Sequence, residues 1–247
     1  MIFPAWTLGN ILLYAYFVLL VLAIAPLELR GLSMMNYSKF RPAQGWPGRT
    51  GMVILYALPL VALVAAAVPY LPKATPIQWL VFGAVAVHFI KRVLESLFVH
   101  RYSGPIGIFT TLLIAGFYSL AAFLIGYLNR TPLPSVDGWF MLGGVLFVVG
   151  ALGNFYHHKL LADLRRDTLD YAIPHGGFFQ WVACPHYLFE IIIWLGIFLL
   201  SRHFAALLVL AFIIAYLSAR AVRTLRWYRE KFTDFPKERK AILPFIF

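Results

Sequence analysis

The sequence has few charged residues, few acids and a single cysteine. Only 13% of its 247 residues are charged and 62% are hydrophobic, whereas soluble domains carry about 25% charged residues. This composition excludes an ordinary soluble domain and favours a protein of the lipid bilayer. The lone Cys184 excludes an internal disulfide and any metal centre built from several cysteines. The net charge of +11 suits anionic headgroups and anionic small molecules, and we expect no nucleic-acid partner.

Long apolar runs occupy most of the chain. A helix that crosses the hydrocarbon core needs about 20 mostly apolar residues. We predict seven such spans, at residues 5–27, 51–71, 77–100, 106–128, 138–159, 187–201 and 203–224. The runs are too long and too uniformly apolar for barrel strands. The predicted fold is therefore an all-α integral membrane protein, a bundle of seven transmembrane helices in one domain over residues 1–247.

The basic residues alternate between the two sides of this predicted bundle. Only Lys73, Arg130 and Arg202 fall on one side, and the other 18 of the 21 fall on the opposite side. Basic loops face the cytoplasm, so the N-terminus should lie outside and the C-terminus in the cytoplasm. We expect a multi-pass protein of a bacterial inner membrane, or of the endoplasmic reticulum in a eukaryote, with its active site facing the cytoplasm.

The first polar cluster is HFIKRVLESLFVHRYS, at residues 88–103. His88, Lys91, Arg92 and Glu95 recur at spacings of three and four, which places them on one helix face and lets Lys91 pair with Glu95. One reading is a helix end whose long side chains reach the headgroups. The residues lie deeper in the span than that requires, so we expect a polar cavity.

The second cluster, GNFYHHKLLADLRRD, carries Asn154, His157, His158 and Asp163. Adjacent histidines on a helix point about 100° apart and chelate poorly. A metal would need further ligands such as His88, His100, His175 or His186, and we expect none. The alternative reading is a polar helix end among headgroups.

The third cluster runs from residue 220 to the C-terminus, RAVRTLRWYREKFTDFPKERKAILPFIF. Arg220, Arg223 and Arg226 are three residues apart, and aromatic residues are interleaved with the later basic ones. Guanidinium forks match phosphate oxygens, and aromatic faces hold flat rings, so this region suits a dinucleotide. A glycine-rich dinucleotide fingerprint is missing, so the site must be built from helix ends and loops.

Three stretches together resemble the steroid 5α-reductase family of membrane reductases, which includes trans-2-enoyl-CoA reductases and polyprenol reductases. They are GNFYHHKLLADLR, YAIPHGGFFQWVACPHYLFEIIIWLG and WYREKFTDFPKERKAILPFIF. The resemblance implies that residues 106–247 bind NADPH and that residues 1–105 form the substrate-side spans. The implied reaction is hydride transfer to the β-carbon of a carbonyl-conjugated C=C bond in a lipid, then protonation of the α-carbon.

The resemblance also implies site residues. Cofactor contacts are expected from Asn154, Arg165, Tyr171, His186, Glu190, Trp194, Arg220, Tyr228, Arg239 and Lys240, to which we add His158 and Arg223. His186 stands where the family often has Asn, and Thr224 where steroid-type members have His. The functional candidates of the enoyl-CoA branch match Lys91 and Tyr187. We expect Tyr187 to be the proton donor and Lys91 to assist it or hold the substrate carbonyl, with His88 and Glu95 in supporting catalytic roles.

The steroid-type substrate positions are changed. Tyr56 and Ala57 stand where that branch has a Gln-Glu pair, and Phe89 where it has Tyr. Tyr56 and Phe89 are the expected substrate-binding residues, although Glu28 could face the site instead. The sequence leaves open whether the substrate is a steroid enone, an enoyl thioester or a polyprenol-like lipid.

Residues 171–190, YAIPHGGFFQWVACPHYLFE, should cover the nicotinamide half of NADPH. Gly176 and Gly177 would allow close approach or a positive φ, and Pro185 would start a helix that carries Tyr187 and Glu190. The plainer reading is an interfacial loop with an aromatic belt. Two other functions stay open: an S-adenosylmethionine-dependent methyltransferase of the isoprenylcysteine type, and a non-catalytic lipid-binding relative.

Overall fold

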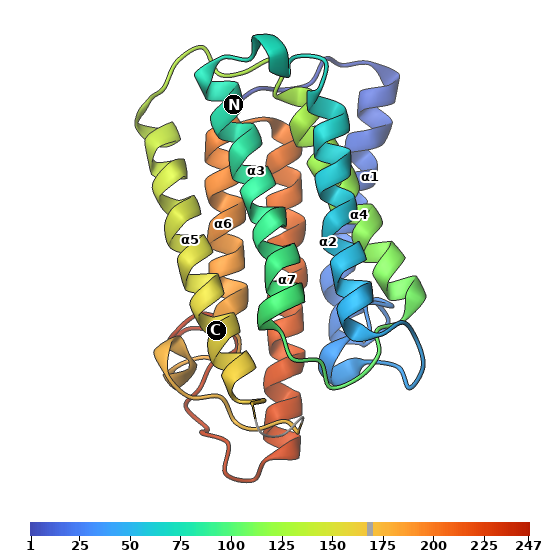
Figure 1. The fold of residues 1–247 in the computed structure, drawn as a ribbon, viewed down its shortest axis with the longest axis vertical. Helices are drawn as coiled ribbons and strands as arrows, with labels where there is room; N and C mark the ends of the chain where they lie inside the picture. Colours follow the sequence, from blue (N-terminus) through green and yellow to red (C-terminus); the bar gives the residue numbers. More distant parts are fainter. Residues whose placement is uncertain (167–169) are drawn as a thin grey trace.

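The computed structural model describes residues 1–166 and 170–247, and these form an α-helical bundle (Figure 1). No strand occurs within these two ranges, only isolated β-bridges. The helices are α1 (Leu8–Leu29), α2 (Gly48–Ala67), α3 (Pro76–Leu94, continued by a π-helical turn over Glu95–Val99), α4 (Ile108–Leu128), α5 (Gly138–Asp163), α6 (Pro185–Ser201) and α7 (Phe204–Lys231). They lie roughly parallel along the long axis of the molecule.

Six of these helices are long and apolar enough to cross a membrane, and α6 is apolar but shorter, with 17 residues. The chain is therefore a multi-pass membrane protein. Each predicted span coincides with one helix, but α5 and α7 continue beyond the predicted ends, to Asp163 and Lys231. An ion pair between Lys159 and Asp163, 2.7 Å apart, lets the last turns of α5 stay helical in polar surroundings.

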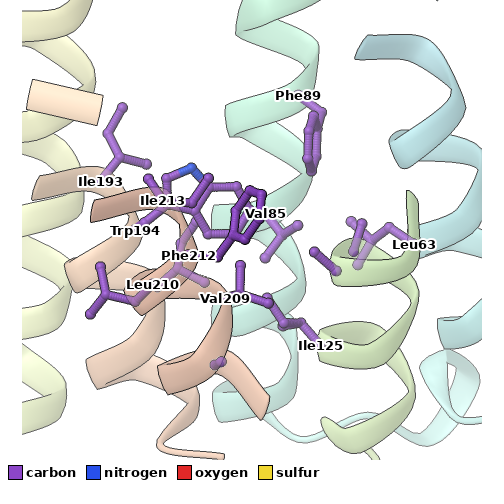
Figure 2. Close-up of a cluster of buried hydrophobic side chains, with 14 of the residues drawn as sticks. Leu63, Val85, Phe89, Ile125, Ile193, Trp194, Val209, Leu210, Phe212 and Ile213 are labelled. Carbon is purple, nitrogen blue, oxygen red and sulfur yellow. The ribbon is translucent and has the colours of Figure 1, made fainter. Parts of the chain in front are cut away.

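The apolar core lies where α2, α3, α4, α6 and α7 meet (Figure 2). Helix α7 is the most buried of the candidate spans and α1 the least. Helix α1 packs along α7 at the edge of the bundle. The labelled core side chains are Leu63, Val85, Phe89, Ile125, Ile193, Trp194, Val209, Leu210, Phe212 and Ile213. This packing fixes the ends of α3, α6 and α7, which carry most of the polar clusters.

Helices α5 and α6 approach each other closely at glycines. A Cβ atom on Gly150 would lie 2.7 Å from the backbone nitrogen of Ile193, and one on Gly196 would lie 2.6 Å from that of Phe147. Such contacts are forbidden, so only glycine permits this spacing. The close packing holds the polar end of α5 against the start of α6.

The connecting segments before α2, after α3 and after α5 gather at the end of the bundle where the C-terminus lies (Figure 1). The C-terminal tail is tied to the segment before α6 by backbone hydrogen bonds. Lys240 donates to the Trp181 carbonyl at 2.9 Å, Ala183 donates to the Lys240 carbonyl at 2.8 Å, and Cys184 donates to the Ala241 carbonyl at 3.1 Å. Tail and segment therefore form one folded unit at this end.

Candidate active site

A cavity of about 220 Å³ opens among these segments and the neighbouring helix ends. The segments contribute cationic side chains, and the helices contribute tyrosines and apolar side chains. The cationic lining residues are Lys39, Arg41, Arg92, Arg101 and Arg165. The lining residues from helices α2 and α4 to α7 include Met52, Leu55, Tyr56, Ile114, Tyr118, Asn154, His158, His186, Tyr187, Glu190, Tyr216 and Leu217. One cavity therefore combines cations that suit phosphate groups with an apolar space lined by tyrosines.

Glu95 is the centre of a buried charge cluster beside the cavity. Its carboxylate lies 2.7 Å from the Lys91 ammonium, forms an ion pair with Arg92, and lies 3.2 Å from Nδ1 of His158. Lys91 also donates to the side-chain oxygen of Asn154 at 2.5 Å. The predicted Lys91–Glu95 pair is confirmed, and with two cations around one acid the cluster keeps a net positive charge.

Of the two cations of this cluster, Arg92 rather than Lys91 lines the cavity. Its guanidinium donates to the Tyr56 hydroxyl at 2.7 Å and lies 4.5 Å from the ring centroid. Arginine has no acceptor, so the Tyr56 oxygen accepts this bond and its own proton is free to point elsewhere. Tyr56 is thus a hydrogen-bond donor held beside a fixed positive charge.

Glu190 of α6 also lines the cavity. Its carboxylate accepts from the Trp194 indole at 3.1 Å and lies 3.3 Å from Nε2 of His88. Phe89 is fully buried and stacks edge-on with Tyr118 and Trp194, so it belongs to the core and does not line the cavity. Glu190 is therefore the acid that reaches the cavity, while His88 and Trp194 hold it from behind.

Of residues 171–190, only His186, Tyr187 and Glu190 line the cavity, and the segment before them is folded against α5. Both predicted glycines have positive φ, 86° at Gly176 and 49° at Gly177, and a Cβ on Gly177 would lie 2.7 Å from the Tyr156 ring. The Phe178 backbone donates to Nε2 of His157 at 3.1 Å. Pro185 occupies the first turn of α6, as predicted, so Tyr187 and Glu190 project from its first two turns.

Lys39 lies in a ring of aromatic faces at the cavity wall. Its ammonium lies 4.7 Å from the Tyr228 centroid, 5.4 Å from that of Tyr171 and 5.5 Å from that of Trp227. Burial above all, together with repulsion from Arg165, lowers the pKa of Lys39 from 10.5 to about 8. A cation held in this way gains most from an anionic ligand.

Arg41 and Arg165 are held in place on either side of Tyr171. Arg41 donates to the Tyr171 hydroxyl at 3.2 Å and to Ser103 at 2.9 Å. Arg165 lies over the Tyr171 ring at 4.5 Å and donates to the Arg101 carbonyl at 3.0 Å. These contacts leave part of each guanidinium directed to the cavity, which both residues line.

Arg220 and Arg223 do not line the cavity. Both pair with the fully buried Glu28 of α1, at 2.9 and 2.8 Å. Arg220 also donates to the carbonyls of Met35 and Tyr37, both at 3.0 Å. Glu28 therefore does not face the site, and the arginines instead hold the 30–47 segment that carries Lys39.

The expected site residues divide into two groups. Those that line the cavity are Tyr56, Asn154, His158, Arg165, His186, Tyr187 and Glu190. Those that lie behind or beside it are His88, Phe89, Lys91, Glu95, Tyr171, Trp194, Arg220, Arg223, Tyr228, Arg239 and Lys240. Arg239, for example, donates to the Pro174 carbonyl at 2.9 Å and so holds the segment before α6. The structure adds Lys39, Arg41, Tyr118 and Tyr216. The stretch NYSKFR, residues 36–41, is a signal for the first two, and Tyr118 and Tyr216 lie within apolar spans that give none.

Glu95, His100 and His158 bring three potential ligand atoms within 4.8 Å of one another. The Arg92 guanidinium contacts Glu95 and lies 2.8 Å from Nδ1 of His158. A divalent cation at this point would have to displace that guanidinium. The arrangement therefore serves an ion-pair cluster better than a metal.

Comparison with known proteins connects this site to a group of reductases. A family model described as 3-oxo-5-alpha-steroid 4-dehydrogenase matches residues 105–247. The bovine 3-oxo-5-alpha-steroid 4-dehydrogenase 1 is 29% identical over 231 residues, covering 89% of this chain and 90% of the relative. Polyprenal reductase of Xenopus laevis is 33% identical over 187 residues, 68% and 59% of the two chains. The very-long-chain enoyl-CoA reductase of Dictyostelium discoideum is 32% identical over 168 residues, 65% and 55%.

Proposed function

The chain belongs to the steroid 5α-reductase family, and on that premise we propose that it is an NADPH-dependent membrane reductase. Its substrate would be a lipid with a C=C bond conjugated to a carbonyl group. The observation that carries this proposal is that one cavity is lined both by cations from the loops and by tyrosines and apolar side chains from the helices. Reductase names among the relatives, for steroid, polyprenal and enoyl-CoA substrates, support the same reaction class.

The chemistry of the lining residues fits a dinucleotide phosphate. Lys39, Arg41 and Arg165 supply cations for phosphates, and Tyr171 lies between the two arginines. Buried nitrogens on two lining residues, Nε2 of His100 and Nδ1 of His186, have no hydrogen-bond partner in residues 1–166 and 170–247. Buried polar atoms normally have partners, so a bound ligand is a natural source of one.

The bound cofactor would supply a hydride, and the protein's own groups would position the substrate and supply the proton. Tyr187 is the proposed proton donor to the α-carbon, since it lines the cavity two residues from the start of α6. Tyr56 would donate a hydrogen bond to the substrate carbonyl, because Arg92 occupies its acceptor lone pair. Lys91 would act by positioning Asn154, whose amide donates to the His186 carbonyl at 2.9 Å.

We place the loops that carry these cations in the cytoplasm. The excess of basic residues at that end of seven spans, with α6 as the sixth, supports this orientation. Single cysteines introduced near residue 237 should be labelled only from the cytoplasmic side. Cys184 will not interfere, since it is buried and burial raises its thiol pKa to about 11.

The direct test is ligand-dependent thermal stability of the purified protein in detergent. A ligand that binds only the folded state raises the melting temperature by mass action. NADPH, NADH and S-adenosylmethionine are compared in parallel, and a rise with NADPH is expected. A rise with S-adenosylmethionine alone would overturn the reductase proposal in favour of a methyltransferase. Binding of NADPH without turnover of enone, enoyl or polyprenal substrates would indicate a non-catalytic relative.

A further inference from the structure

A second concave surface lies next to the cavity, between the ends of α3 and α5. We call it the basic groove, and its volume is about 540 Å³. Its lining residues are Arg49, Phe98, Val99, His100, Arg101, Tyr102, Lys159, Ala162, Asp163 and Arg166. Four of these side chains are cationic and one is a carboxylate, so the groove is strongly positive. None of the cofactor-contact residues expected from the sequence lines it.

The single acid of the basic groove is already paired. Asp163 accepts from Lys159 at 2.7 and 2.8 Å. Arg49, Arg101 and Arg166 form no ion pair with any carboxylate in the part of the chain that the structure describes. Three guanidinium groups share this concavity with one carboxylate, which already pairs with Lys159, and this excess of positive charge favours a ligand with phosphate groups.

The basic groove is continuous with the cavity of the candidate active site. His100, Arg101, Tyr102 and Ala162 line both. The local backbone is held by hydrogen bonds, with Arg101 donating to the Arg166 carbonyl at 3.4 Å and Arg165 donating to the Arg101 carbonyl at 3.0 Å. A molecule with its reactive end in the cavity could therefore place a second, polar end in the groove.

We propose that the basic groove binds the phosphorylated head of the substrate, so that the substrate is an anionic nucleotide-linked acyl thioester rather than a neutral enone. This inference rests on the proposed function and narrows its substrate class. Loops at the cytoplasmic surface of a membrane protein are commonly basic. What distinguishes this surface is the shared lining with the cavity and the predominance of arginine, which binds phosphate by two parallel hydrogen bonds.

The first measurement uses coenzyme A itself, a phosphorylated thiol without an alkene. The full-length protein is placed in nanodiscs of phosphatidylcholine and saturated with NADP⁺, so that the nucleotide cavity is occupied. Coenzyme A should raise the melting temperature of the wild type and of Arg30→Gln, an exposed arginine at the same end of the bundle but outside the groove. It should not do so in Arg49→Gln or Arg166→Gln.

The second measurement compares two thioesters with the same acyl chain, trans-2-hexadecenoyl-coenzyme A and its N-acetylcysteamine analogue. Each groove substitution should raise KM for the coenzyme A ester about tenfold, as expected for loss of a charge-assisted hydrogen bond, with kcat unchanged. The analogue has no phosphate, so its kinetics should be the same in all variants. Added salt should raise KM only for the coenzyme A ester.

Several outcomes would overturn the inference. Coenzyme A binding that NADP⁺ abolishes would place it in the cofactor cavity, and equal binding to wild type and groove variants would place it elsewhere. If the groove variants differ only in their response to phosphatidylglycerol in the nanodisc, the groove binds membrane headgroups. The NADPH-dependent thermal shift of the same samples is read separately, because its absence would refute the proposed function whatever the groove binds.

Discussion

Lys39 gives the sharpest test of where the cofactor's phosphates bind. Its folded pKa is about 8 because burial disfavours the charged form. The ammonium is therefore mostly protonated at pH 7, but only about one-tenth protonated at pH 9. If a phosphate requires the charged form, NADPH affinity should fall about tenfold between pH 7 and pH 9. The assay is the dissociation constant for NADPH, measured by fluorescence at fixed ionic strength.

Two substitutions isolate this effect. Lys39→Met removes the charge, so its affinity at pH 7 should be about tenfold weaker and should not change up to pH 9. Lys39→Arg keeps a charge across this range, because arginine is protonated at any of these pH values. Its affinity should therefore show no decline with pH. The curves for wild type and Lys39→Met should converge above pH 9.

Stability without ligand should change in the opposite direction. The folded pKa of about 8 lies below the reference value of 10.5, so between these values the unfolded chain binds more protons. Stability contributed by this group therefore rises as pH increases from 8 to 10.5. The wild type should gain melting temperature relative to Lys39→Met over that range, while its response to NADPH shrinks. A wild-type NADPH affinity that is flat from pH 7 to 9 would refute the assignment of Lys39 to a phosphate.

Three further substitutions test the site and the bundle. Tyr187→Phe should lower turnover at least about 100-fold, the usual scale for a lost general acid, while the NADPH thermal shift stays unchanged. Tyr156→Phe is the control. Full turnover in Tyr187→Phe would exclude Tyr187 as the proton donor. Gly150→Ala should destabilise the folded protein by about 1–3 kcal/mol through overpacking against Ile193. The control Gly144→Ala, whose added Cβ meets open space, should not. Equal melting temperatures for the two variants would contradict the close packing of α5 and α6. Glu28→Gln should lower the free energy of unfolding by about 3–5 kcal/mol, because it leaves Arg220 and Arg223 buried without their acid. It should also expose the 30–47 segment to protease. Unchanged cleavage would show that other contacts hold this segment.

The number and place of the helices could be predicted from the sequence, because each span is a long apolar run between basic or turn-forming residues. The ends of α5 and α7 could not. The last turn of α7 carries Arg229 and Lys231, and α5 ends with Lys159 and Asp163; on hydropathy alone such charged residues indicate a loop. In the structure, Lys159 pairs with Asp163 along the helix, and Tyr228 near the end of α7 is buried against Phe235. These tertiary and local contacts extend the helices into polar surroundings.

The site was predictable where a residue's position in its helix decides its direction. Tyr187 and Glu190 follow from Pro185, which starts α6. Helical spacing alone could not decide whether Lys91 or Arg92 lines the cavity. Adjacent residues are only about 100° apart, and both belong to one broad face of the helix. The neighbours decide: Glu95 and Asn154 hold Lys91, which leaves Arg92 to reach Tyr56 across the cavity wall.

The arginines of α7 show why charge pattern alone does not decide which cations can reach a ligand in the cavity. Arg220 and Arg223 have the spacing of a phosphate-binding face, yet both pair with Glu28, 192 residues before Arg220. Lys39 and Arg41 were counted only as markers of the cytoplasmic side, yet they line the cavity. A cation is available to a ligand only if no buried acid already holds it. That depends on long-range contacts, here between α1 and α7, and for this reason we propose the phosphate-binding role for the segment that the α7 arginines hold in place rather than for α7 itself.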